Sequence, residues 1–216
     1  MKYLFFSFLL IIGFTNVSFI TDDVVWNLEK NENGISIFTR AYPKSDYKEF
    51  KAVTTLQTTL SALLALKNDF ENYPSWYHEC PEAHTLKIIS SAEGYYYVTK
   101  KLPWPFDARD MAIHYWTSQD LNDKSITIKN VAEGNYIPLN DDYVRINELN
   151  GFWKFTPKGN GMVEIVYQLH AEPNGSIPSW LANSTVVDTP YNTFLKMKEM
   201  LTQAKYANAK IADIVE

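Results

Sequence analysis

The chain has 216 residues, of which 46% are hydrophobic, and this composition fits a globular protein and excludes the disordered and fibrous classes. Its net charge of −5 at pH 7 argues against a nucleic-acid partner, because such proteins usually carry a basic face. The single cysteine excludes an intramolecular disulfide framework and a cysteine-rich zinc site, whereas the aromatic content of 15% predicts either a bulky core or an aromatic-lined cavity.

The first segment resembles a secretory signal peptide. Lys2 is followed by an uncharged run over residues 3–20, whose most apolar part ends before Thr15 and Asn16. We therefore expect residues 1–20 to be removed as a signal peptide and the mature protein to be secreted or periplasmic. The alternative is an uncleaved anchor, because a run of 18 uncharged residues could barely span a bilayer core of ~30 Å.

The rest of the chain reads as one domain, over residues 22–210, because no repeat, charge block or Pro/Gly/Ser-rich linker divides it. After an opening segment at 26–30, alternation of side chains predicts a strand at Ile35–Arg40, and a second strand is expected at 47–57. Leucines spaced three and four apart after Thr58 and Thr59 predict a helix over 60–70. Further strands are expected at 85–90, 95–101, 110–118, 125–132, 142–147, 152–157 and 163–171. Their short connections predict antiparallel neighbours.

The last element changes to a helical period. Apolar residues recur every three to four positions, which predicts a long amphipathic helix with a kink at Pro190. They are Ile177, Trp180, Leu181, Val187, Tyr191, Phe194, Leu195 and Leu201. The predicted class is α+β: a large antiparallel sheet, a short helical insertion and one long C-terminal helix. A sheet that curves around such a helix can enclose a volume.

Motifs of common catalytic sites are absent from the sequence. No Gly-x-Ser-x-Gly and no Gly-rich phosphate loop occurs, and His78, Cys80 and His84 lack a matching second pair of ligands. We therefore expect no cofactor, no metal and no catalytic residue.

One charged group stands out at the start of a predicted strand. Arg109 shares a strand face with Met111, Ile113 and Tyr115. An inward-pointing arginine there would need an acid partner or a ligand anion. A solvated turn is the alternative interpretation.

Several stretches, in order, resemble the steroidogenic-acute-regulatory-related lipid transfer (START) domain family over about residues 24–205. The most recognisable is Pro103-Trp104-Pro105 followed by Arg109-Asp110. The others are Asn33 to Arg40, Tyr47 to Ala52, Asn68-Asp69-Phe70 with Trp76, Tyr143 to Ile146, Gly151-Phe152-Trp153 and Ile177 to Asn183. The resemblance implies a helix-grip fold, in which a curved antiparallel sheet forms a hollow closed by the C-terminal helix.

The resemblance also implies that the hollow binds one lipid or sterol-like molecule and that the protein is not an enzyme. Sterol-binding members carry an acid–arginine pair, and the matching positions here are Tyr96 and Tyr115, so their ligand is not carried over. We expect a monomer that makes transient contact with a membrane. The residues expected to contact the ligand are Tyr96, Arg109, Met111, Ile113, Tyr115, Trp180, Leu181, Tyr191 and Phe194.

Two other functions remain open at this point. A cyclase or hydratase on the same architecture would need a titratable group in the hollow, and His114 or Asp110 would be its acid or base. Both residues lie on the strand face opposite Tyr115, so binding is favoured. A third interpretation is a structural interaction module, in which the apolar face of the C-terminal helix only packs in the core.

Overall fold

The computed structural model describes residues 25–216, so the predicted signal peptide lies outside the described residues. The strands are β1 (Asn27–Glu32), β2 (Ile35–Arg40), β3 (Glu49–Gln57), β4 (Ala83–Ser90), β5 (Glu93–Lys100), β6 (Arg109–Gln119), β7 (Ile126–Ala132), β8 (Val144–Arg145), β9 (Glu148–Gly159) and β10 (Met162–Glu172). The helices are α1 (Leu60–Asn68), α2 (Tyr73–Trp76), α3 (Ser179–Met200) and α4 (Ala204–Ala207), with a 3-10 turn at Phe70–Asn72.

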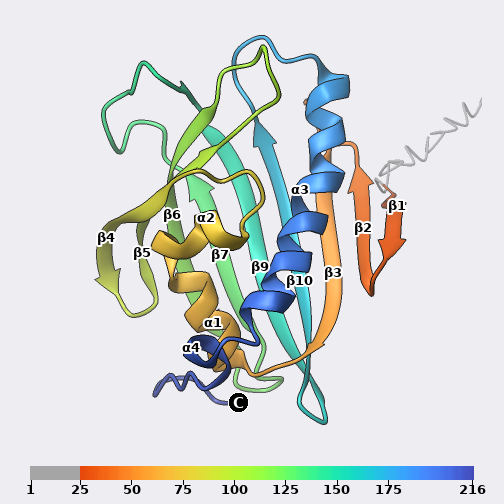
Figure 1. The fold of residues 1–216 in the computed structure, drawn as a ribbon, viewed down its shortest axis with the longest axis vertical. Coiled ribbons are helices and arrows are strands. Elements are labelled where there is room, and N and C mark those ends of the chain that lie inside the picture. Colours follow the sequence, from red (N-terminus) through yellow and green to blue (C-terminus); the bar gives the residue numbers. More distant parts are fainter. Residues whose placement is uncertain (1–24) are drawn as a thin grey trace, which may run out of the picture.

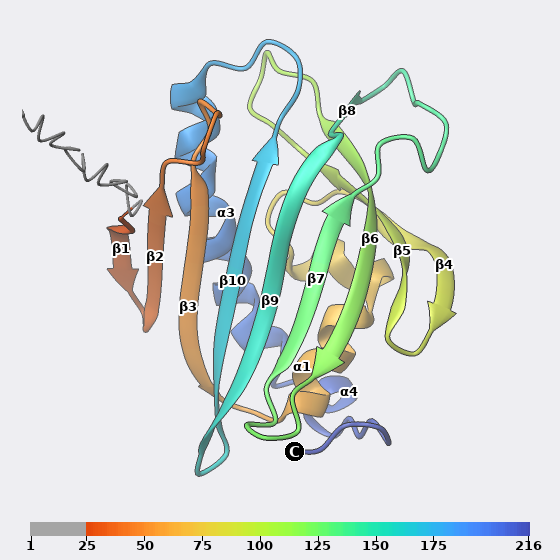
Figure 2. The ribbon, with the colours of Figure 1, turned by 180° about the vertical axis from the view of Figure 1, so that it is seen from behind.

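A single curved sheet carries the fold, with the strand order β1-β2-β3-β10-β9-β7-β6-β5-β4. All helices lie on one face of this sheet, and α3 runs along the strands (Figure 1). Seen from behind, the opposite face of the sheet has no helix over it (Figure 2). The predicted α+β helix-grip architecture is confirmed.

The strand predicted at 142–147 is the main departure from the expected plan. Only Val144 and Arg145 form a strand there, β8, and it pairs in parallel with the start of β6. The chain leaves the sheet after β7 and returns in the direction of β6, so the expectation of antiparallel neighbours is wrong at this position. The remaining described pairs are antiparallel.

Side-chain oxygens accept hydrogen bonds from the first main-chain N–H groups of helix α1. The Thr59 side chain accepts a hydrogen bond from the Ala62 N–H at 3.1 Å, as the capping prediction requires. The carboxylate of Glu216 accepts bonds from the N–H groups of Leu60 and Ser61 at 2.8 and 2.9 Å. This carboxylate also suits the positive end of the helix dipole.

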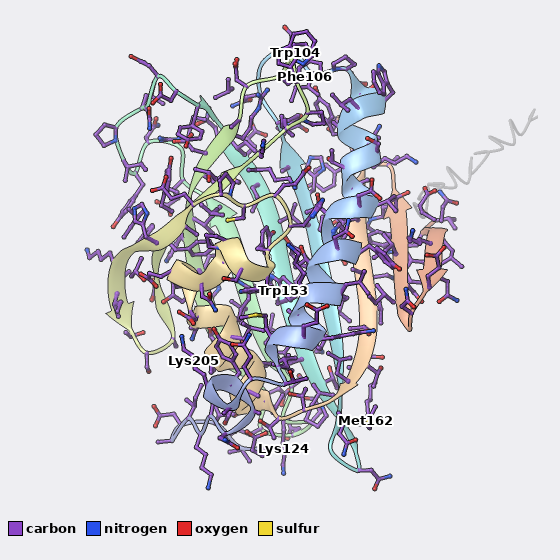
Figure 3. All side chains as sticks on the ribbon, viewed as in Figure 1. Trp104, Phe106, Lys124, Trp153, Met162 and Lys205 are labelled. Atoms are coloured by element: carbon purple, nitrogen blue, oxygen red, sulfur yellow. The ribbon has the colours of Figure 1, made fainter. Side chains whose placement is uncertain are left out.

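Helix α3 has two halves with different surroundings. Its second half is buried in the core through Tyr191, Phe194 and Met197, and Phe194 approaches Trp153 of β9 with ring centroids 5.8 Å apart. Trp153 is seen between α2 and α3 in Figure 3. The helix continues through Pro190, which cannot donate to the preceding turn and leaves one helical hydrogen bond unmade.

Within residues 25–216, no helix is both long and apolar enough to cross a membrane.

Candidate ligand-binding cavity

A cavity of about 150 Å³ lies between the inner face of the sheet and the first half of α3. Strands β5, β6, β9 and β10 supply nearly half of its lining residues, and helices α1 and α2 contribute Lys67 and Tyr73 at one end. The wall is largely apolar and aromatic. Such a chamber, with few polar groups, is typical of a small-molecule site.

Four of the residues predicted to contact a ligand line this cavity: Tyr96, Arg109, Met111 and Ile113. The last three alternate along β6 and point inward, as the strand period required. Tyr96 comes from β5, and its hydroxyl donates to the Asn130 side chain at 3.2 Å. Burial raises the pKa of Tyr96 well above its usual value, so this phenol stays protonated. Contact of these residues with a ligand stays a prediction.

The structure does not bring the other five predicted residues to the cavity. Tyr115 is buried and lies against Phe70, with ring centroids 5.2 Å apart. Trp180 is 72% exposed, whereas Leu181, Tyr191 and Phe194 are buried in packing contacts. The helix residues that line the cavity are instead Ala182, Thr185, Val186 and Thr189. On α3, the lining residues are thus smaller neighbours of the predicted apolar face, whose Tyr191 and Phe194 pack in the core. Contact of the five residues with a ligand stays a prediction.

Arg109 is buried and ordered, but its partners differ from those expected. Its guanidinium donates to the main-chain carbonyls of Pro173, Asp107 and Asn174 at 2.9, 2.5 and 2.7 Å. The sequence predicts an acid partner or a ligand anion, whereas three carbonyl oxygens accept hydrogen bonds from the guanidinium in the structure. Burial lowers the pKa of Arg109. Arg109 therefore fixes the segment before α3 to the start of β6.

The acid and base proposed for the enzyme alternative are engaged elsewhere. Asp110 accepts two hydrogen bonds from Arg145, each at 2.8 Å, and both side chains are nearly inaccessible. The His114 ring lies 2.8 Å from the Glu93 carboxylate and 3.3 Å from that of Glu133. Neither Asp110 nor His114 lines the cavity.

Sequence reasoning missed Lys67, which lies in the last turn of α1 and is only 2% exposed. Its ammonium group lines the cavity and donates a hydrogen bond to the Tyr73 hydroxyl. Burial lowers its pKa from 10.5 to about 7, because desolvation disfavours the charged form. The spacing of Leu60, Leu63 and Leu64 could have found this residue, since it continues their helix face.

The loop that follows α2 contains Cys80, the single cysteine of the sequence. Cys80 is buried, and its thiol points to the Glu82 carbonyl at 3.4 Å. Burial raises the pKa of this thiol to about 11, so it is a poor ligand and nucleophile. In the part of the chain that the structure describes, no three His, Cys, Asp or Glu side chains gather to hold a metal ion.

Known proteins share the sequence pattern and the fold of this chain. A family model described as START domain matches residues 20–206. The uncharacterized protein PA1579 of Pseudomonas aeruginosa is 38% identical over 168 residues, which cover 78% of this chain and 82% of that protein. The crystal structure of a STAR-related lipid transfer protein from Xanthomonas axonopodis is 33% identical, with a TM-score of 0.77, and covers 82% of this chain and 99% of that one. Human STARD10 has the same fold at 19% identity, with a TM-score of 0.70 over 83% of this chain and 74% of that chain.

Proposed function

Since the chain belongs to the START domain family, we propose that it binds one lipid molecule in its internal cavity and releases it unchanged. The observation that carries the proposal is the largely apolar chamber between the sheet and the first half of α3. Burying a hydrocarbon chain there removes apolar surface from water, which stabilises a complex by about 25 cal/mol per Å².

The engagement of Asp110 and His114 supports binding over catalysis. A cyclase or hydratase needs an acid or base that reaches the substrate, and these two candidates are held by Arg145, Glu93 and Glu133 away from the cavity. Recovery of a chemically altered ligand would favour the enzyme alternative.

The test is to purify the protein without detergent, extract it with organic solvent and identify co-purifying lipids by mass spectrometry. We expect one class of lipid at close to one molecule per chain. Ala182→Trp, which places a bulky ring against the cavity lining, should reduce this occupancy. Ala207→Trp, at an exposed position of α4, is the matched control and should retain the lipid. Equal occupancy in both variants, or no lipid in the wild type together with no uptake of added lipid, would contradict the proposal.

Transfer of a lipid requires contact with a membrane, and two exposed tryptophans support this part of the proposal. Trp104 is 92% exposed and Trp180 is 72% exposed. Trp104 lies at the tip of the loop between β5 and β6, at the end of the molecule where α3 begins (Figure 3). Tryptophan is favoured at the membrane–water interface. Trp104→Ala should therefore reduce sedimentation with vesicles; undiminished sedimentation would place the contact elsewhere.

The proposal includes export and a monomeric mature protein, and the uncharged run after Lys2 supports the export. N-terminal sequencing of protein from the cell envelope should begin near residue 21. An intact Met1 would argue for a retained anchor. Light scattering of the mature protein should give the mass of one chain.

A further inference from the structure

At one end of the cavity, aromatic rings surround the Lys67 ammonium group. The ammonium nitrogen lies 4.9 Å from the ring centroid of Tyr73 and 5.5 Å from those of Tyr96 and Trp153. These rings offer the weak attraction of their π faces, and the Tyr73 hydroxyl accepts a hydrogen bond from the ammonium group. The side chain is nearly inaccessible but is not neutralised by a carboxylate of any residue in the described chain.

The cavity lining carries an imbalance of charge. Among the described residues it contains four basic side chains and no acidic one. Lys48 pairs with Glu29 at 3.2 Å, Lys100 pairs with Glu79 at 3.0 Å, and Arg109 is bonded to carbonyl oxygens. Arg109 and Lys67 both lack a carboxylate partner, but three carbonyl oxygens hold the Arg109 guanidinium, whereas the Lys67 ammonium donates to one neutral hydroxyl. An anion that enters the cavity would supply the missing partner of Lys67.

Neutral donors line the same cavity as Lys67. The hydroxyls of Tyr77 and Tyr167 are hydrogen-bonded to each other, and both side chains line the cavity. The pair holds two hydroxyl hydrogens and uses one of them internally, so the other is available to a ligand oxygen. Burial raises the pKa of both phenols, so neither becomes a competing anion near neutral pH.

We propose that Lys67 binds the carboxylate of a long-chain carboxylic acid whose hydrocarbon chain occupies the apolar part of the cavity. This inference rests on the proposed lipid-binding function and names the ligand class. A monoanion matches the one lysine of the lining that lacks a carboxylate partner, whereas a phosphate monoester would bring a second charge to a place where the donors of the other cations are already engaged. The tyrosine pair would donate to the second carboxylate oxygen.

The test compares three ligands with the same chain in lipid-free protein: dodecanoate, dodecanol and dodecyl phosphate, below their critical micelle concentrations. The wild type should bind dodecanoate about tenfold or more tightly than dodecanol at pH 7, because a hydrogen bond to a charged group is strong when buried. Lys67→Met should abolish this preference and retain the binding of dodecanol. Lys101→Met, which replaces an exposed lysine, is the matched control and should keep the preference.

Proton uptake gives a second readout that needs no variant. The pKa of Lys67 in the empty cavity is about 7, and a bound carboxylate would raise it. Calorimetry at pH 8 in buffers of different ionisation enthalpy should therefore show uptake of a proton with dodecanoate and none with dodecanol. The affinity for dodecanoate should fall as the pH rises from 7 to 9, by up to about tenfold per pH unit.

The outcomes separate this inference from the function on which it rests. Dodecanol binding without a preference for dodecanoate, or a preference that survives in Lys67→Met, would overturn the inference and leave lipid binding intact. Tighter binding of dodecyl phosphate than of dodecanoate would overturn the choice of carboxylate. Failure of all three ligands to bind would contradict the proposed function itself.

Discussion

Replacing Lys67 with methionine should make the lipid-free protein more stable. Methionine has a similar length without a charge, and the Tyr73 hydroxyl would keep its 2.7 Å hydrogen bond to the main-chain carbonyl of residue 67. A fall in the lysine pKa from 10.5 to about 7 corresponds to about 5 kcal/mol, at about 1.4 kcal/mol per pH unit. This is the destabilisation present when Lys67 is protonated in the folded protein.

The sign of the pH dependence follows from the protons bound by each state. Below pH 7 the lysine is protonated in the folded and the unfolded chain, so the full destabilisation is present. Between pH 7 and 10.5 the unfolded chain holds a proton that the folded chain lacks, and wild-type stability rises with pH relative to the variant. The advantage of Lys67→Met should be widest below pH 7 and narrow by about 2 kcal/mol between pH 7 and pH 9.

Urea unfolding of lipid-free wild type and variant at pH 6, 7, 8 and 9 measures this difference. The assay needs the linear dependence of the unfolding free energy on urea concentration. Lys101→Met serves as the control for loss of one positive charge at the surface. If the difference between Lys67→Met and the wild type is the same at every pH, the lysine does not titrate as a buried cation and the reasoning fails.

Three further predictions concern the frame around the cavity. Asp110→Ala should cost about 3–5 kcal/mol in urea unfolding, because it leaves the buried Arg145 unpaired; a loss below 1 kcal/mol would show that water reaches Arg145. Arg109→Met should cost about 3 kcal/mol, because three carbonyl groups lose their donor, and unchanged stability would mean that water replaces it. The Lys48 N–H donates to the Asn183 side chain at 2.9 Å, so cysteines at positions 48 and 183 can link α3 to the sheet in a protein without the native thiol. Oxidation of this pair should slow lipid uptake, measured with a fluorescent fatty acid. Reduction should restore it, and an unchanged rate would place the entrance away from α3.

The architecture could be read from the sequence because its elements repeat simple periods. The strand predicted at Ile35–Arg40 has the same bounds in the structure, because successive side chains there are alternately buried and half-buried. The C-terminal helix was recognised from its apolar spacing. The parallel pairing of β8 escaped prediction because it depends on where a long loop returns to the sheet, which no local pattern records.

The site was only partly predictable, for a physical reason. Inward-facing residues of one strand share a parity, so Arg109, Met111 and Ile113 could be placed together. Lysines usually lie on the solvated side of a helix, so residue type alone does not mark Lys67 as a site residue, although its spacing places it on the buried face of α1. On α3, hydrophobicity indicated residues that pack in the core, such as Phe194, but it also selected Trp180, which is exposed. The cavity is lined by smaller and more polar neighbours such as Thr185.

Because the cavity lies within the core, the free energy of unfolding depends on whether a ligand occupies it. A ligand that binds only the folded state adds RT ln(1 + [L]/Kd) to the unfolding free energy, which is about 2.7 kcal/mol at a hundredfold excess over Kd. A preparation with mixed occupancy would then contain two populations that melt at different temperatures. In the cell, the empty form would be the one exposed to proteases, so the supply of ligand would set the abundance of the protein as well as its cargo.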